Sequence, residues 1–73
     1  MNKDFLKILS EVLEISEVEI NRELELNDEN WTSISIISYM DEIDQKFDIQ
    51  LDGEELENCL NVGNLEEYTF SKK

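Results

Sequence analysis

Apolar residues recur at helical spacing in the middle of the chain, and this pattern restricts the fold more than any other feature. They lie in and just after the segment from Thr32 to Lys46, at positions i, i+4, i+7 and i+11: Ile36, Met40, Ile43 and Phe47. At roughly 100° per residue, the four side chains fall within about 60° of one another on a helix, with Tyr39 on the flank. We therefore expect a helix that packs this stripe against a core.

A second helical pattern occupies the N-terminal segment, from about Lys3 to Glu14. Its apolar residues are spaced i, i+4 and i+7: Phe5, Leu9 and Val12. Asn2 is suited to cap this helix, and Asp4 lies in the first turn, where the helix dipole favours an acid. The helical period then fails from Ile15 to Asn30, which predicts a long loop held to the core at intervals.

The C-terminal third predicts two shorter helices. Asp52, with Glu55 three residues later, forms the pattern of a capping box and opens a short helix through about Leu60. A last helix is expected from about Asn64 to Phe70. No proline or low-complexity linker interrupts the chain, so we expect a single domain over residues 1–73. The predicted fold is all-α, a small four-helix bundle with a long first loop and a short third helix.

The charge balance excludes several classes of function. The chain of 73 residues has 19 acidic and 6 basic side chains, a formal charge of −13. Between Ile8 and Glu67 the only bases are Arg22 and Lys46, against 18 acids, so this part carries −16. Such a surface repels nucleic acid and favours basic protein partners. No apolar run is long enough to span a membrane. We expect a cytoplasmic monomer that binds neither nucleic acid nor membrane.

Few residues are suited to catalysis or to metal binding. The chain has no histidine and one cysteine, Cys59, so we expect neither a zinc site nor an activated thiol. The run from Asp48 to Gly53 begins like a calcium loop, but the twelfth position is Cys59 instead of a bidentate glutamate. We therefore expect no metal site and no enzymatic activity, and we interpret Cys59 as a small, half-buried apolar residue.

One face of the central helix carries apolar and acidic residues outside the core stripe. Four of them share this face with Ser33: Ile34, Ile37, Asp41 and Asp44. Scattered surface apolar residues are ordinary and need no function. The functional interpretation is a docking surface placed beside a hydroxyl that can be modified. The residues alone leave both interpretations open.

The stretch Trp31-Thr32-Ser33-Ile34, with Phe47 fourteen residues after the serine, resembles the acyl carrier protein family. In that family an Asp-Ser-Leu motif opens the second helix, and the Trp-Asp-Ser-Leu variant is familiar among free-standing carriers. The likeness extends to Asn61-Val62-Gly63-Asn64-Leu65, which resembles the family's Thr-Val-Gly-Asp-Leu lead into the last helix. One departure affects the motif itself. Thr32 can still cap the helix through its hydroxyl, but it lacks the carboxylate of the family's aspartate, which helps hold magnesium during arm transfer.

The resemblance implies a carrier function. Ser33 would be esterified by 4′-phosphopantetheine, delivered from coenzyme A by a phosphopantetheinyl transferase, and the thiol of that arm would hold acyl or aminoacyl groups as thioesters. Further partners would be an acyl- or aminoacyl-loading enzyme and downstream transferases with basic docking surfaces, in fatty acid or specialised metabolite biosynthesis. The alternative is an unmodified acidic adaptor of the same fold that binds a basic protein. The cargo and the pathway do not follow from the sequence.

Overall fold

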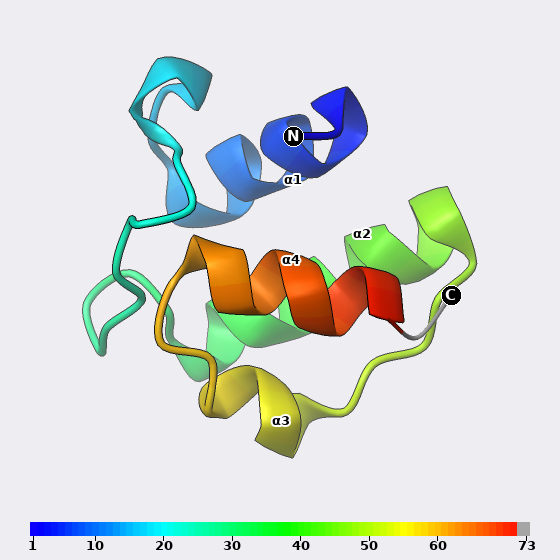
Figure 1. Cartoon of the computed structure of the whole chain (residues 1–73). Coiled ribbons are helices and arrows are strands. Elements are labelled where there is room, and N and C mark those ends of the chain that lie inside the picture. Colours follow the sequence, from blue (N-terminus) through cyan, green and yellow to red (C-terminus); the bar gives the residue numbers. More distant parts are fainter. Residues whose placement is uncertain (72–73) are drawn as a thin grey trace.

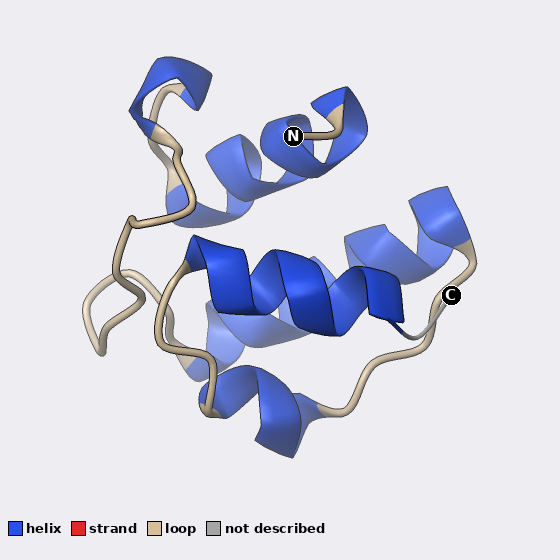
Figure 2. Ribbon diagram, in the orientation of Figure 1, coloured by secondary structure: helices blue, strands red, loops and turns tan. Residues whose placement is uncertain are grey.

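The computed structural model describes residues 1–71, which form four α-helices and one short 3₁₀ helix around one apolar core (Figures 1 and 2). The elements are α1 (Lys3–Leu13), η1 (Glu17–Glu19), α2 (Ser33–Phe47), α3 (Gly53–Glu57) and α4 (Val62–Ser71). Figure 1 shows α4 crossing in front of α2, with α1 above and α3 below. The all-α bundle with a long first loop and a short third helix is confirmed.

The two longer helices begin with the caps that their sequences predict. The Asn2 side chain accepts hydrogen bonds from the N–H groups of Asp4 and Phe5, at 2.8 and 3.1 Å. The Thr32 hydroxyl accepts one from the N–H of Ser35 at 3.2 Å. Both helices end in a left-handed residue, Glu14 and Asp48. The boundaries therefore differ from the expected ones by only one residue.

The long loop between α1 and α2 is held by backbone hydrogen bonds to the α3–α4 connection and to the first residues of α4. The Leu26 N–H donates to the carbonyl of Leu60 at 3.0 Å, and the Val62 N–H donates to the carbonyl of Leu24 at 3.0 Å. A third bond, of 2.9 Å, joins the Gly63 N–H to the carbonyl of Arg22. This ladder satisfies polar groups that a loop against the core would otherwise leave without partners. The loop also contains one short turn of helix, η1.

The core stripe of α2 is rotated relative to the expected one. Ile36 and Ile43 are buried, as predicted, but Met40 and Phe47 are only partly buried. Tyr39, expected on the flank, is completely buried and hydrogen-bonds the hydroxyl of Thr69 in α4 at 2.6 Å. The buried face thus turns toward Tyr39, because the contact with Thr69 places α4 against that side of α2. Figure 1 shows α4 crossing α2.

The C-terminal helices also differ from their predicted bounds. Asp52 caps α3 through the N–H of Glu54, at 2.9 Å, and its own N–H donates to the hydroxyl of Tyr68. Because Tyr68 takes the donor that Glu55 would have engaged, the predicted capping box is not completed. The third helix ends at Glu57 instead of Leu60, and the last one begins earlier, at Val62.

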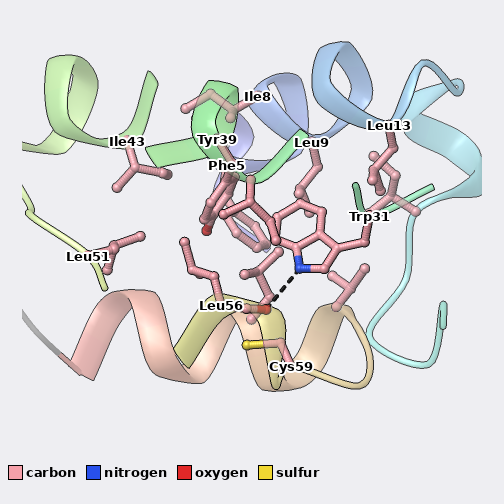
Figure 3. Packing of buried hydrophobic residues seen from close by; sticks show 14 of the residues in the cluster. Phe5, Ile8, Leu9, Leu13, Trp31, Tyr39, Ile43, Leu51, Leu56 and Cys59 are labelled. Carbon is pink, nitrogen blue, oxygen red and sulfur yellow. Dashed lines mark hydrogen bonds between the residues drawn. The ribbon is translucent and has the colours of Figure 1, made fainter. Parts of the chain in front are cut away.

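Trp31 anchors the end of the loop in the core. Its indole N–H donates a 2.8 Å hydrogen bond to the carbonyl of Leu56, as Figure 3 shows, and its ring packs edge-on against Tyr39 at 5.5 Å between centroids. The chain immediately after Trp31 is therefore placed by α3 as well as by α2.

Within the described residues, no helix is long and apolar enough to cross a membrane.

Candidate functional site

Ser33 is the first residue of α2, and its side chain is exposed. Thr32, the residue before it, caps the helix. The Thr32 hydroxyl accepts a hydrogen bond from the N–H of Ser35, and the Thr32 carbonyl accepts one from the N–H of Ile36 at 2.9 Å. Over residues 1–71, neither the Ser33 hydroxyl nor the N–H groups of Ser33 and Ile34 have a hydrogen-bond partner. One hydroxyl and two backbone donors are thus open to a ligand at this helix end.

This arrangement suits a phosphate group. The N-terminus of an α-helix carries unsatisfied N–H groups and the positive end of the helix dipole, and both favour an anion. The helix is 15 residues long, so its dipole is well developed. A phosphodiester on the Ser33 hydroxyl would lie against those donors. The residues present therefore fit the attachment of a phosphorylated group.

Ser33 lines a shallow pocket of about 310 Å³ together with residues from the loop and from α3. Trp31 and Ile36 contribute apolar surface, and Asp28 and Glu57 contribute carboxylates. These two acids line the same pocket as the serine, although the residue directly before it, Thr32, has no charge. Sequence reasoning did not select Asp28 or Glu57, because only the folding of the loop and of α3 brings them to the start of α2.

Ser35 is the nearest competing hydroxyl, and the structure gives it a different position. Its side chain is half-buried and hydrogen-bonds the Thr32 hydroxyl at 3.1 Å. Its N–H also takes part in the cap. The helical wheel puts Ser35 about 200° round the helix from Ser33 and predicts a solvent-facing side chain, so this partial burial corrects that prediction. Ser33 is the more accessible of the two hydroxyls.

The four residues expected to form a docking strip are all exposed, but they do not line one surface depression. Ile34 is 77% exposed and Ile37 is 66% exposed. Ile34 borders a hollow between α1 and α2, whereas Ile37 and Asp44 border another between α2 and the α2–α3 link. Asp41 lines both hollows. The strip is therefore divided into two parts, with Asp41 at the boundary.

Cys59 is buried, and its thiol donates to the carbonyl of Glu55 with 3.6 Å between sulfur and oxygen. Burial, with a smaller effect from the Glu55 carboxylate, raises the pKa of the Cys59 thiol. A raised pKa disfavours the reactive thiolate, which agrees with the interpretation of Cys59 as an apolar packing residue. In the part of the chain that the structure describes, no group of three or more acidic, cysteine or histidine side chains is placed to hold a metal ion.

Comparison with known proteins adds one finding to this geometry. Residues 3–69 match the model of a family described as a phosphopantetheine attachment site. The matched segment includes α1, α2 and α3 entirely, and most of α4. No curated protein and no solved structure matches the chain.

Proposed function

The chain belongs to the phosphopantetheine-attachment family, whose domains carry covalent 4′-phosphopantetheine, and we propose that Ser33 is the residue that holds this group here. The arm would carry acyl or aminoacyl groups as thioesters and present them to the enzymes of a biosynthetic pathway. We further propose that the domain spans residues 1–73, acts as a cytoplasmic monomer and catalyses no reaction itself.

The observation that supports Ser33 most is the difference in exposure and hydrogen bonding between the two serine hydroxyls in the first turn of α2. Ser33 is exposed and has no hydrogen-bond partner among the described residues, and two open backbone donors adjoin it. Ser35 is half-buried and bound to Thr32. Since a transferase must reach the hydroxyl from outside, Ser33 is the better acceptor.

The chain's own residues would present the acceptor and hold the product. The Ser33 hydroxyl oxygen would lose its proton and form the new bond to the phosphorus next to the pantetheine. The pyrophosphate bond of coenzyme A would break, and adenosine 3′,5′-bisphosphate would leave. The N–H groups of Ser33 and Ile34 would donate to the resulting phosphodiester. When bound, the arm supplies a terminal thiol that forms thioesters. A flexible tether keeps the attached group at high effective concentration for each docked enzyme.

The exposed strip on α2 supports a docking role in this proposal. Asp41 and Asp44 give it negative charge, and Ile34 and Ile37 give it apolar contact area beside Ser33. The partners would be the phosphopantetheinyl transferase, a loading enzyme and downstream transferases, each with a basic surface. Charges at such a rim act mainly on the rate of association.

Thr32 favours one second candidate. Because the family's aspartate is absent at this position, the chain could serve as an unmodified acidic adaptor that binds a basic protein. The two candidates differ in a single chemical property, the presence of the arm. An intact mass measurement therefore separates them.

The test is co-expression with a broad-specificity phosphopantetheinyl transferase, followed by intact mass spectrometry. We expect the wild-type chain to gain the mass of one phosphopantetheine and the Ser33→Ala variant to gain none. Ser35→Ala and Ser38→Ala, which remove other hydroxyls from the same helix, should retain the gain. An arm mapped to Thr32 or Ser35 would refute the assignment. A wild-type chain that stays unmodified would instead support the adaptor.

A further inference from the structure

Two residues belong both to the pocket that Ser33 lines and to the apolar core. Trp31 and Ile36 line the pocket, yet only 7% of Trp31 and 5% of Ile36 are exposed. Both also belong to the cluster of buried apolar residues. Their side chains therefore form the boundary between the pocket and the core. A hydrocarbon chain attached at Ser33 would have to pass this boundary in order to leave water through the pocket.

Trp31 is held in this boundary by a polar and an apolar contact. Its indole N–H donates to the carbonyl of Leu56 in α3 at 2.8 Å, and its ring packs edge-on against Tyr39 of α2 (Figure 3). An inserted hydrocarbon chain that displaced the indole would break this hydrogen bond and offer no acceptor in its place. A buried N–H without a partner costs free energy, so the structure favours the closed position of Trp31.

A second buried polar contact lies next to Trp31 in the core. The hydroxyls of Tyr39 and Thr69 are 2.6 Å apart, and both side chains are completely buried. Over residues 1–71, every buried side-chain nitrogen or oxygen atom has a hydrogen-bond partner. A hydrocarbon chain inserted between α2 and α4 would separate the two hydroxyls and satisfy neither of them. The part of the core that adjoins Trp31 therefore opposes entry of an apolar chain.

The pocket itself also disfavours a long hydrocarbon chain. Asp28 and Glu57 contribute carboxylates to its lining, and none of the lining residues is a lysine or arginine. A hydrocarbon chain that filled the pocket would displace water from these carboxylates, and removing a charged group from water is costly. A polar or very short group leaves the carboxylates hydrated and does not meet this cost.

We propose that Trp31 is a specificity-determining residue, which keeps the group attached through Ser33 out of the core. This inference rests on the proposed function, because it takes the attached group to be the cargo of the arm. A hydrocarbon chain that stays in water costs free energy in proportion to its exposed apolar surface. The cargo that suits this protein is therefore a short acyl group or a polar one, such as an aminoacyl group, and not a long hydrocarbon chain.

The test attaches hydrocarbon chains at position 33 without a transferase. The protein carries Ser33→Cys together with Cys59→Ala, so that it has a single thiol, and it reacts with ethyl or decyl methanethiosulfonate. The thiolate at position 33 forms a disulfide with the alkylthio group, and methanesulfinate leaves. The melting temperatures and the ¹H–¹⁵N NMR spectra of the ethyl and decyl adducts are then compared.

With Trp31 in place, the decyl adduct should melt no higher than the ethyl adduct. The amide signals of Tyr39, Leu56 and Thr69 should coincide in the two spectra. A higher melting temperature for the decyl adduct, with shifted signals at these three residues, would show that the chain enters the core. That result would overturn the inference.

Trp31→Leu should open the boundary. This variant removes most of the ring and leaves an apolar cavity beside the pocket, while the Leu56 carbonyl keeps a second donor, the N–H of Cys59, at 3.2 Å. The decyl adduct of Trp31→Leu should melt several degrees above its ethyl adduct, because the chain fills the cavity. Trp31→Phe, which makes a smaller cavity at the same place, should give a smaller rise and serves as the test if Trp31→Leu does not fold.

Phe5→Leu is the matched control for the cavity. Phe5 on α1 is completely buried and packs against Tyr39, but it does not line the pocket beside Ser33. The decyl adduct of Phe5→Leu should melt no higher than its ethyl adduct. An equal rise in Phe5→Leu and Trp31→Leu, or no rise in either variant of Trp31, would overturn the role of Trp31.

The tether stands in for the arm, so the result does not depend on whether Ser33 accepts phosphopantetheine. Intact mass spectrometry of the wild-type chain reports arm attachment separately. An unmodified wild-type chain would refute the carrier function, whereas a decyl chain that enters the core past Trp31 would refute only the proposed exclusion of cargo. The two failures are therefore distinguishable.

Discussion

At the scale of single residues, Thr32 determines how the candidate attachment site is built. Its hydroxyl caps α2 by accepting from the N–H of Ser35, which leaves the donors of Ser33 and Ile34 open. Aspartate caps helices at least as well as threonine, so the cap does not explain why a carboxylate is absent. The difference between the two residues that bears on arm transfer is the negative charge of aspartate.

The first prediction follows from that difference. Thr32→Asp should speed arm transfer by a broad-specificity transferase several-fold, because it restores the carboxylate of the related motif while keeping the cap. Thr32→Ser, which keeps the hydroxyl and adds no charge, is the control and should leave the rate near wild type. Initial rates measured by mass spectrometry decide the outcome. An unchanged rate in Thr32→Asp would show that a carboxylate at this position is unimportant here.

Glu42 provides a second prediction, about stability and pH. Burial raises the pKa of Glu42 above its ordinary value, so the folded state favours the protonated form. The contribution of Glu42 to the free energy of unfolding is fully present below about pH 4.3, the ordinary pKa of glutamate. This contribution is lost as the pH rises through the raised pKa of the folded state. Glu42→Gln should therefore raise the melting temperature at pH 7, by a gain within about 0.5 kcal/mol.

The same variant should lose its advantage in acid. At about pH 3 and below, wild type and Glu42→Gln should melt at the same temperature, because the side chain at position 42 is then neutral in both. Glu17→Gln removes the same charge from the exposed η1 and should give a smaller gain at pH 7. Calorimetric scans across this pH range make the comparison. A gain from Glu42→Gln that did not change with pH would contradict the burial argument.

At the scale of elements, the contact between the long loop and α4 depends on a close approach of two backbones. A Cβ at position 63 would lie 3.1 Å from the carbonyl oxygen of Arg22, and backbone cannot move aside as a side chain can. The Arg22 side chain also pairs with Glu66 and Glu67 of α4. Gly63 therefore allows the loop to be joined to the start of the last helix.

The two glycines of the chain provide a matched test of this contact. Gly63→Ala should destabilise the fold by about 1–3 kcal/mol, as expected for overpacking against a rigid neighbour. Gly53→Ala should be tolerated, because its Cβ would meet only the sulfur of Met40, at 3.8 Å. Urea unfolding of both variants measures the difference. Equal stability would show that the loop can shift without cost.

At the scale of the whole molecule, charge of one sign dominates. The ion pairs formed by bases of the described chain are few, and in each of them the base is exposed. They join Arg22 to Glu66 and Glu67, and Lys46 to Asp4. Exposed pairs of this kind contribute between 0 and about 1 kcal/mol each. Against them stands a formal charge of −13. Self-repulsion should therefore outweigh attraction in the folded state.

Added salt should stabilise the protein for this reason. Raising the ionic strength to about 0.1 M shortens the Debye length to about 10 Å and screens the repulsion, so the melting temperature should rise by several degrees. Magnesium and calcium at equal millimolar concentration should act alike, as general counterions. Thermal melts over a salt series measure the effect. A flat response would mean that the acids are spaced widely enough not to oppose folding.

Local patterns determined those features that depend on neighbouring residues alone. Helical periodicity placed α1 and α2 within one residue, and the polar residues before them identified the caps at Asn2 and Thr32. The exposure of Ile34 and Ile37 also followed from the helical wheel. These features need only the 3.6-residue repeat and the open N–H groups of a helix end, both of which can be read over a few residues.

Only the tertiary structure decided which surfaces meet. The position of α4 made Tyr39 the centre of the buried α2 face, whereas Phe47 is only partly buried. The hydroxyl of Tyr68 took the Asp52 N–H that a capping box would have used. The approach of α1 made a hollow on one side of Asp41 and separated Ile34 from Ile37. Each of these contacts joins residues distant along the chain. The hydrophobic repeat within one helix does not show which distant element will cover a given side of that helix.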